Sequence, residues 1–450
     1  MQLPENFINK MKNILGAEIN DFLESLNNPP VKAVTVNFNK LNKQTFENVA
    51  DFEIKPIEMV SNGYYVQNLK FGNHLLNHLG IIYSQEPSAM YPVEMLGIKE
   101  NDLVLDMCAS PGGKSIQILE KLNNTGLCVS NEIVYNRCKI LYENINRMSF
   151  ANSIITCNSP EDFENLDVKF DKILIDAPCG GEGMFRKNNF DFNAYKQINP
   201  DTNAKRQLSI LNSCKSLLKN GGRLAYSTCT YDTTENECVI EKFLQDNKDF
   251  KLIDMKEFSK VTTLGVSENS DIASKTYRRY PHLHTGEGQF MAILEKVGDT
   301  DNSYLSDKFS AVNFSEISRK DKNTLNDFFK NIADISSLQI FKKNDSFFAI
   351  PKTLIDLENL NVLNAGCLIG TINKNIFKIS HNFYKVYSHL FFNHIELDST
   401  QATNYIKGLE IDSPHENCIC VVTHLGVALG GGKVTNNKIK NYYPKELRIN

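Results

Sequence analysis

The middle of the chain alternates between two hydrophobic periods. Short apolar runs typical of strands cover residues 103–107, 127–130, 154–157, 172–177, 223–227 and 290–294, and helical spacing covers 114–122, 136–147, 204–218 and 234–244. Strands separated by helical stretches of about ten to fifteen residues predict a parallel sheet wrapped by helices, which is an α/β fold. Ligands of such sheets bind beyond the carboxyl ends of the strands.

The chain before this core has a different pattern. Residues 4–27 have the spacing of one or two amphipathic helices, and the Asn-Asn-Pro-Pro run at 27–30 ends them because proline cannot continue a helix. Residues 31–37 alternate like a short strand. We therefore predict a separate N-terminal region over residues 1–95 and an α/β domain over residues 96–296.

The chain beyond the core divides in two. Residues 297–370 are less regular and rich in lysine, and we predict a small linking domain there. From 371 to 450, short strand-like runs alternate with glycine turns, notably LGGGK at 429–433. This pattern predicts a small β-rich terminal domain.

Composition and charge narrow the class of protein. The 450 residues are 41% hydrophobic and 23% charged, as in globular proteins. The net charge of −4 argues against a protein that coats nucleic acid, although the tail from 433 to 450 carries five cationic side chains and one acidic one. Because the chain has neither a signal-peptide pattern nor a run of about 18 apolar residues, we expect no membrane span.

The eleven cysteines are scattered, and no C-x-x-C pair or zinc-like Cys/His spacing occurs. A disulfide framework is not expected in so long a chain, so the cysteine usage indicates a reducing cytoplasm and no metal site. Most of these thiols should be small buried hydrophobic groups.

A glycine-rich turn, DMCASPGGK at 106–114, follows the first predicted strand and opens a helix. Glycine lets the backbone approach a ligand closely, and a helix N-terminus offers free N–H groups. Glu132, at the end of the second strand, is positioned to accept hydrogen bonds from ribose hydroxyls. Either feature alone could be an ordinary turn or a solvated acid, but together they favour a nucleotide-type ligand.

Three ordered motifs carry a resemblance to a known family. DMCASPGGK at 106–114, DAPCGGEG at 176–183 and YSTCT at 226–230 resemble the signatures of the Sun-type RNA cytosine-C5 methyltransferases. MFRK at 184–187 extends the second motif. QEPSAM at 85–90 and KNYYPK at 440–445 resemble the bacterial F-type branch, which methylates 16S ribosomal RNA. The resemblance covers essentially the whole chain.

The resemblance implies a fold and partners. It implies a class I, Rossmann-like methyltransferase domain with a mostly parallel seven-stranded sheet, an RNA-binding N-terminal region of helical or α+β type, and a PUA-like RNA-binding domain over residues 371–450. It also implies S-adenosylmethionine as the methyl donor and RNA as the substrate, either 16S rRNA or the small ribosomal subunit. We expect a cytoplasmic monomer.

The resemblance also implies roles for individual residues. The cofactor-binding set comprises Cys108, Ala109, Ser110, Pro111, Gly112, Gly113, Lys114, Glu132, Arg137, Asn158 and Asp176. The catalytic set comprises Cys229, Cys179 and Asp176. Asn158 stands where the family usually carries an aspartate that holds the adenine amino group, and its amide oxygen can still accept that bond. Gly180 replaces a commoner serine, and the 31–37 strand lacks an arginine often found in that region.

The chemistry explains why two cysteines are needed. Carbon 5 of cytosine is a poor nucleophile, and addition of the Cys229 thiolate to carbon 6 converts the ring into an enamine that can attack a methyl donor. Asp176 can hydrogen-bond the N3/N4 edge of the base, and Cys179 can assist breakdown of the adduct. Lys114 could lower the pKa of a thiol, or it could only cap the loop.

Two alternatives remain open at this point. A single cysteine is usually a buried hydrophobic residue, but two cysteines at strand ends, each within its own motif, favour catalysis. DNA cytosine methyltransferases carry the nucleophile in a Pro-Cys pair like Pro178-Cys179, and activity of a Cys229→Ala protein would favour that class. A non-catalytic RNA-binding module would fail to bind S-adenosylmethionine.

A target base in RNA must be unstacked, which requires phosphate anchoring elsewhere. Candidate anchors are Arg186, Lys187, Arg278, Arg279 and the basic tail, namely Lys433, Lys438, Lys440, Lys445 and Arg448. Each could instead be a solvated charge.

Overall fold

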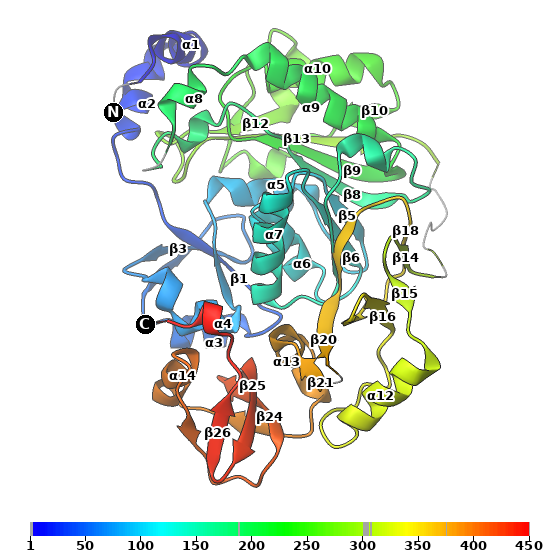
Figure 1. Ribbon diagram of the computed structural model, residues 1–450. Helices are drawn as coiled ribbons and strands as arrows, with labels where there is room; N and C mark the ends of the chain where they lie inside the picture. The colour runs from blue at the N-terminus through cyan, green and yellow to red at the C-terminus, as the bar shows by residue number, and fades with distance from the viewer. Residues whose placement is uncertain (1–2, 188–189, 300–305, 307, 375, 450) are drawn as a thin grey trace.

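A computed structural model describes residues 3–187, 190–299, 306, 308–374 and 376–449. Its centre is a ten-stranded sheet in the order β11-β12-β13-β9-β8-β5-β6-β7-β19, with β10 also paired to β13 (Figure 1). The neighbouring pairs from β7 to β9 are parallel, and β13 is antiparallel to β9. The expected α/β fold is therefore confirmed.

The predicted strands are present with small changes in their bounds. They are β5 (Leu103–Asp106), β6 (Leu127–Asn131), β7 (Ser153–Thr156), β8 (Phe170–Asp176), β9 (Leu218–Thr228) and β13 (Gln289–Lys296). With β12 (Thr276–Arg279) they make the expected seven, and β10 (Phe250–Leu252), β11 (Thr263–Leu264) and β19 (Val362–Ala365) extend the sheet to ten. Only β13 runs against the other six of the central seven, so these are mostly parallel.

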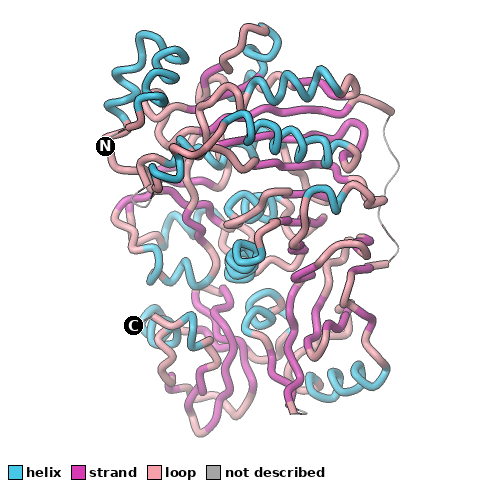
Figure 2. Tube along the Cα trace, turned by 45° about the horizontal axis from the view of Figure 1, so that its top comes forward, coloured by secondary structure: helices cyan, strands magenta, loops and turns pink. Residues whose placement is uncertain are grey.

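Helices cover both faces of this sheet, as Figure 2 shows. Side chains alternate along β5, so that Leu103 and Leu105 pack into one core and Val104 into the other. One core includes side chains of α9 (Pro200–Lys215) and α10 (Glu237–Asp246). The other includes those of α5 (Tyr91–Leu96), α6 (Gly113–Lys121) and α7 (Tyr135–Met148). Smaller helices are α8 (Phe192–Tyr195) and α11 (Ser270–Lys275).

The N-terminal region begins with two helices, as predicted, α1 (Glu5–Leu15) and α2 (Ile19–Ser25). A four-stranded antiparallel sheet follows in the order β2-β3-β1-β4. Its strands are β1 (Ala33–Val36), β2 (Glu53–Pro56), β3 (Gly63–Gln67) and β4 (Ile82–Ser84), accompanied by α3 (Lys43–Val49) and α4 (Leu75–Leu79). The region is therefore of mixed α+β type.

Two five-stranded sheets form the C-terminal third. The first has the order β15-β16-β17-β20-β21, and the second β22-β24-β25-β26-β23; a separate two-stranded sheet pairs β14 with β18 in parallel. The bounds are β14 (Ser310–Ala311), β15 (Ser315–Glu316), β16 (Ile340–Lys343), β17 (Ser346–Ala349), β18 (Asp356–Leu357), β20 (Cys367–Asn373), β21 (Ile376–Ile379), β22 (His394–Glu396), β23 (Ile411–Asp412), β24 (Ile419–His424), β25 (Val427–Thr435) and β26 (Lys438–Asn441). Helices α12 (Arg319–Phe329), α13 (His381–Val386) and α14 (Ser399–Ile406) pack beside them.

The N-terminal sheet and the last sheet pack against each other. Residues of the N-terminal sheet, such as Val34 and Tyr64, share a hydrophobic cluster with Val422 and Leu429 of the last sheet. Strand β19 is antiparallel to β7, so the segment 297–370 is joined to the central sheet. The N-terminal, central and C-terminal parts therefore pack against one another rather than hang on flexible connections.

The glycine-turn interpretation of 429–433 is wrong. These residues lie within β25, and Gly430, Gly431 and Gly432 pair with β24. A Cβ on Gly431 would lie 2.4 Å from the ring of Tyr384, and one on Gly430 would lie 2.6 Å from the Tyr405 hydroxyl. Glycine is needed here because aromatic rings pack directly on the strand, a reason that short-range sequence patterns do not reveal.

Candidate active site

The three motifs converge at the carboxyl ends of β5, β8 and β9. A cavity of about 240 Å³ is lined there by residues from all three motifs, including Cys108, Lys114, Asp176 and Cys229. Residues of the 85–90 motif and of the start of β13 complete the wall, namely Gln85, Glu86, Ala89 and Gln289. The parallel sheet explains this convergence, because its strand ends share one edge.

Asp176 is held from three sides. Its Oδ2 accepts a hydrogen bond from Lys114 Nζ at 2.7 Å, and its Oδ1 accepts one from Ser227 Oγ at 2.7 Å. Gln289 Nε2 lies 3.4 Å from the same Oδ1. Burial acts to lower the pKa of Lys114, but the Asp176 carboxylate outweighs it and raises that pKa above its ordinary value. The two short hydrogen bonds thus fix the position of the Asp176 carboxyl group at the cavity.

The two catalytic candidates are neighbours. Cys179 Sγ and Cys229 Sγ lie 3.4 Å apart, although 50 residues separate them in the chain. The hydrogen bond to Cys229, together with burial, raises the pKa of Cys179 well above its ordinary value. The distance fits either sulfur as the donor, and the raised pKa of Cys179 favours the arrangement in which Cys179 keeps its proton and the Cys229 sulfur accepts, as a nucleophile requires.

A polar scaffold holds the two cysteine turns together. The Gly183 N–H donates to the Cys229 carbonyl at 2.7 Å, and the Gly180 N–H donates to Glu235 Oε2 at 3.1 Å. Glu182 accepts bonds from Thr230 Oγ1 at 2.9 Å and from the Tyr231 N–H at 3.0 Å. Sequence reasoning missed Glu235 and Glu182 as supports, because their partners are dozens of residues away.

The N-terminal helix reaches this scaffold. Lys10 on α1 forms ion pairs with Glu182 and with Asp232, the latter at 2.7 Å. Phe7 on the same helix stacks edge-on against Phe185 with ring centroids 4.8 Å apart. The start of the chain thus supports the second motif, a contact that no local pattern predicts.

The cofactor-side candidates also form a connected group. Arg137 donates to the Ser110 carbonyl at 3.0 Å and pairs with Glu132 Oε2 at 3.1 Å, while Ser110 Oγ donates to the Arg137 carbonyl. This bridge joins the glycine loop at the end of β5 to the carboxylate at the end of β6. The other carboxylate oxygen of Glu132, Oε1, accepts a hydrogen bond from the Val134 N–H.

Within the described part of the chain, Asp106 presents an unpartnered hydrogen-bond acceptor to a ligand in the cavity. It lines the cavity, and burial raises its pKa to about 7. Its Oδ2 accepts from Ser115 Oγ, whereas its buried Oδ1 has no partner among the described residues. An open acceptor beside a glycine loop suits the ribose hydroxyls and the amino group of S-adenosylmethionine.

Asn158 lies nearby but is engaged elsewhere. Its Oδ1 accepts from the Asn361 N–H at 2.9 Å, and its Nδ2 donates to the Asn361 carbonyl at 3.3 Å. This pair ties the end of β7 to the segment before β19. The adenine contact therefore stays a prediction, and it would require Asn158 to share or exchange these bonds.

The prediction of an RNA contact is wrong for three of the candidate residues, because their side chains are buried. Arg278 is 1% exposed and donates through Nε to Glu237 Oε1 at 2.7 Å, and Arg186 pairs with Glu287 at 2.7 Å. Arg279 is 2% exposed and stacks over Tyr91. Only Lys187 of that group is exposed, and it lines the active-site cavity. Sequence could not reveal acidic partners 41 and 101 residues away.

Three family models match separate parts of this chain. Residues 93–295 match the family of 16S rRNA methyltransferases RsmB/F, residues 3–87 the N-terminal domain of 16S rRNA methyltransferase RsmF, and residues 392–449 the methyltransferase RsmF PUA domain. Ribosomal RNA small subunit methyltransferases F of Shewanella oneidensis and Vibrio vulnificus are 29% and 28% identical, over 99% of this chain and 97% of theirs.

Solved structures show the same core. A methyltransferase homolog protein from Pyrococcus horikoshii is 27% identical, with a TM-score of 0.58 over 66% of this chain and 96% of its own. NSun6 from the same organism, solved with SFG, shares the fold with a TM-score of 0.54 and 21% identity, over 66% of this chain and 99% of its own.

The fold and the site together define a class I methyltransferase that uses S-adenosylmethionine. The chain belongs to the RsmB/F family of 16S rRNA methyltransferases, and its flanking regions match those of the RsmF type. In the described part of the chain, no helix is both long and apolar enough to cross a membrane. The described residues also contain no group of three potential metal ligands.

Proposed function

We propose that this enzyme methylates carbon 5 of a cytosine in 16S ribosomal RNA through a covalent bond between Cys229 Sγ and carbon 6 of the base. The observation that carries the proposal is the approach of Cys179 and Cys229 to 3.4 Å at the cavity edge that also holds Asp176 and the glycine loop. A cytosine-C5 reaction needs one sulfur to add to the ring and a second group to assist its departure.

The chain's own groups divide the work as follows. The Cys229 thiolate adds to carbon 6, while the Asp176 carboxylate accepts a hydrogen bond from the N4 amino group and so holds the N3/N4 edge of the base in place. Lys114 keeps Asp176 oriented and lies close enough to Cys229 for the two charges to attract each other. S-adenosylmethionine, held by residues of the 106–114 loop with Glu132, supplies the methyl group when bound.

Release of the product needs the second thiol. Once Cys229 has become a thioether it carries no charge, so the hydrogen bond that keeps Cys179 protonated is weakened. Cys179 then releases its own proton to solvent, the resulting thiolate accepts the proton from carbon 5, and the electrons of that C–H bond expel Cys229 as a thiolate. The ring regains its double bond and the enzyme regains its starting sulfur.

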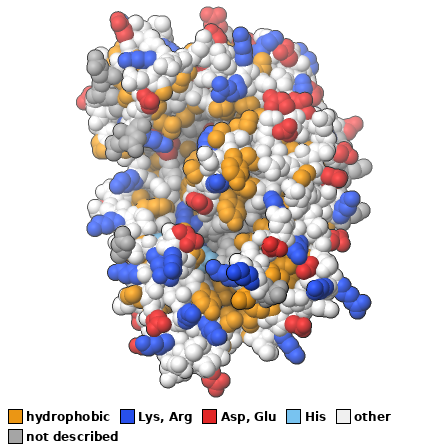
Figure 3. All heavy atoms as spheres, in the orientation of Figure 1, with side chains coloured by type: hydrophobic (Ala, Val, Ile, Leu, Met, Phe, Trp, Pro, Cys, Tyr) orange, Lys and Arg blue, Asp and Glu red, His pale blue; other side chains and the backbone are white. Residues whose placement is uncertain are grey.

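RNA must reach this cavity from an anchored position. A groove of about 950 Å³ lies between β21 and the last sheet. Its lining includes the aromatic residues Phe377 and Tyr442 and the cationic residues Lys378, Lys433, Lys445 and Arg448, and its acidic residue is Glu446. Figure 3 shows apolar side chains bordered by lysines and arginines on the lower half of one face. Aromatic rings beside cations bind single-stranded nucleic acid by stacking and phosphate contact, so we assign RNA to this groove.

We further propose that each region of the chain has the role expected from the sequence. Residues 1–95 and the PUA-like residues 371–450 contact RNA, residues 96–296 carry out methyl transfer, and residues 297–370 link them. The family matches at 3–87 and 93–295 support the first two bounds, whereas the third match begins at 392 and the 370/371 bound falls within β20. We infer a cytoplasmic monomer that meets its ribosomal substrate there.

The test is a pair of alanine variants with S-adenosylmethionine and 16S rRNA. Cys179→Ala should accumulate a covalent RNA adduct on a denaturing gel, because release is blocked after attack. Cys229→Ala should form none. Equal amounts of adduct from both variants would refute the assignment of roles. Bisulfite sequencing of 16S rRNA from cells with and without the protein tests the substrate, and unchanged 5-methylcytosine positions would contradict it.

A further inference from the structure

A second polar cavity lies at the opposite edge of the central sheet from the active site. Its volume is about 210 Å³, and its wall comes from separate parts of the chain. Asn124 precedes β6, and Ser149 and Phe150 precede β7, so the cavity lies at the amino ends of these parallel strands. The proposed chemistry has no use for this place.

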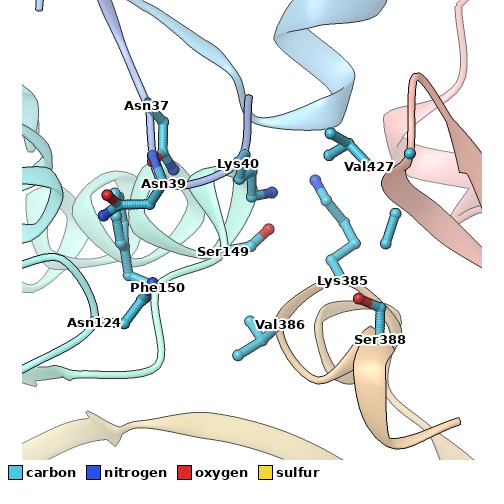
Figure 4. A pocket seen from close by; sticks show the side chains of 12 residues that line it. Asn37, Asn39, Lys40, Asn124, Ser149, Phe150, Lys385, Val386, Ser388 and Val427 are labelled. Carbon is cyan, nitrogen blue, oxygen red and sulfur yellow. The ribbon is translucent and has the colours of Figure 1, made fainter. Parts of the chain in front are cut away.

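Two lysines dominate the cavity. Lys40 follows β1, and Lys385 lies on α13 with 6% of its surface exposed. Figure 4 shows the two amines reaching from these separate elements into the space between them. None of the described residues that line the cavity is an aspartate or a glutamate.

The surroundings add further positive charge. Lys40 Nζ donates to the Leu79 carbonyl at 2.7 Å, and Lys385 Nζ donates to the carbonyls of His78 and Arg147 at 2.9 Å each. These carbonyls belong to the C-terminal turns of α4 and α7, whose dipoles offset part of the charge. The other titratable groups that face the lysines are Arg147, His78 and His381, and all of them are basic.

The donors are not all used by the protein. An ammonium group has three N–H donors. Lys40 donates one of them to a carbonyl, and Lys385 donates two. When both amines are protonated, three N–H groups thus remain for a ligand in a polar cavity large enough for a small oxyanion. Burial together with neighbouring cations lowers the pKa of Lys40 to about 7 and that of Lys385 well below its ordinary value. An anion would remove this unfavourable repulsion.

We propose that this cavity binds a phosphate group between Lys40 and Lys385. The phosphate could come from an RNA backbone or from free inorganic phosphate, and both sources present the same oxygens to the amines. Assignment to RNA rests on the proposed function, whereas binding of a free phosphate does not. The N-terminal region, the α/β domain and α13 would then be joined by one anion.

The first measurement is calorimetric titration of the full chain with inorganic phosphate at low salt. Wild-type protein should show one saturable site, and Lys40→Met and Lys385→Met should each weaken it by at least about tenfold, because each removes one of the two amines that would face the anion. Lys40→Arg should retain binding. Lys242→Met, which removes an exposed lysine paired with Asp246 on α10, is the matched control and should bind as wild type. Absence of a saturable site, or wild-type binding by both cavity variants, would overturn the proposal.

A thermal melt separates a phosphate site from a purely structural role. If the lysines serve only to join helix ends, Lys40→Met should lower the melting temperature by the same amount with and without phosphate. The proposal instead predicts that phosphate raises the melting temperature of the wild type but not that of Lys40→Met. Sulfate, whose charge is constant from pH 6 to 8.5, should bind more weakly as pH rises, because Lys40 must be protonated.

Competition identifies the source of the phosphate. If 16S rRNA displaces phosphate, and Lys40→Met lowers the salt slope of RNA binding by about one unit, the ligand is a backbone phosphate. If phosphate stays bound beside saturating RNA, the ligand is the free anion. Both outcomes support the cavity site. Cys229→Ala should bind phosphate as wild type does, so failure of the proposed chemistry would leave this result unchanged.

Discussion

Cys179 and Cys229 come from turns that follow two neighbouring parallel strands, β8 and β9, and their sulfurs meet at 3.4 Å. Each turn is also fixed by backbone bonds to the other, since the Gly183 N–H donates to the Cys229 carbonyl. The pair is therefore held in register by the sheet itself. Changes near this pair should act on separate steps of the reaction, which makes them distinguishable.

Lys114 is expected to be needed for chemistry rather than for folding. Lys114→Met would leave Asp176 without its charged partner and remove the cation near Cys229. Loss of a preorganised charge typically costs about 100-fold or more in rate, and single-turnover methylation should show it. Lys121→Met is the control; it lies at the end of the same helix as Lys114, breaks the pair with Glu94 of α5, and should keep the wild-type rate. A Lys114→Met rate equal to that of the control would exclude the role.

Glu235 should make stability depend on pH. Burial raises its pKa to about 7 in the folded protein from an ordinary value of 4.5, so the folded state binds the extra proton. The stability that this proton contributes is present below pH 4.5 and is lost as pH rises to 7. Glu235→Gln removes the titration while keeping an oxygen for Gly180 and Gln207. Urea unfolding should show that the unfolding free energy of the variant, measured relative to that of the wild type, rises by about 1–3 kcal/mol between pH 5 and pH 8. A constant difference across this range would contradict the assignment.

Arg278 should be a stability residue with no part in RNA binding. Arg278→Met leaves Glu237 buried without its cation, and breaking such a pair costs about 3–5 kcal/mol of unfolding free energy. Lys251→Met, which breaks the half-exposed pair with Glu295, should cost less than about 1 kcal/mol. Denaturant unfolding compares the two. An Arg278→Met protein of wild-type stability with a flatter salt slope for RNA would restore the RNA-contact hypothesis.

Arg278 marks a limit of what could be predicted from the sequence. The apolar runs of β5, β6 and β8 predicted their strands because buried parallel strands are hydrophobic throughout, and the rule on strand ends brought the three motifs together. Strand β12 escaped prediction because Thr276–Arg279 looks polar, and Arg278 is buried only by virtue of Glu237. Lys10 and Glu182 meet across 172 residues, a distance over which no local pattern carries information.

Gly431 offers a test of the corrected C-terminal fold. In Gly431→Ala the new methyl group would meet the ring of Tyr384 at 2.4 Å, and Tyr384 is buried. Overpacking of this kind costs about 1–3 kcal/mol, so the melting temperature should fall. Gly72→Ala, at a site with nothing within 4 Å, is the matched control and should melt near the wild type. Equal melting of both variants would show that the glycines form an open turn after all.

The groove beside the last sheet should hold RNA by two separable forces. Tyr442 is 39% exposed there, and Tyr442→Ala should weaken RNA binding by about 1–3 kcal/mol without changing the salt slope, because it removes stacking and no charge. Lys433→Met should instead lower the slope of log K against log salt by about one unit, because it removes one phosphate contact. Lys256→Met, an exposed lysine of the α/β domain, is the control for lost surface charge. Filter binding at several salt concentrations measures all three. If Lys433→Met and Lys256→Met change the slope equally, RNA does not lie in the groove, and the C-terminal sheet must serve another partner or only the fold.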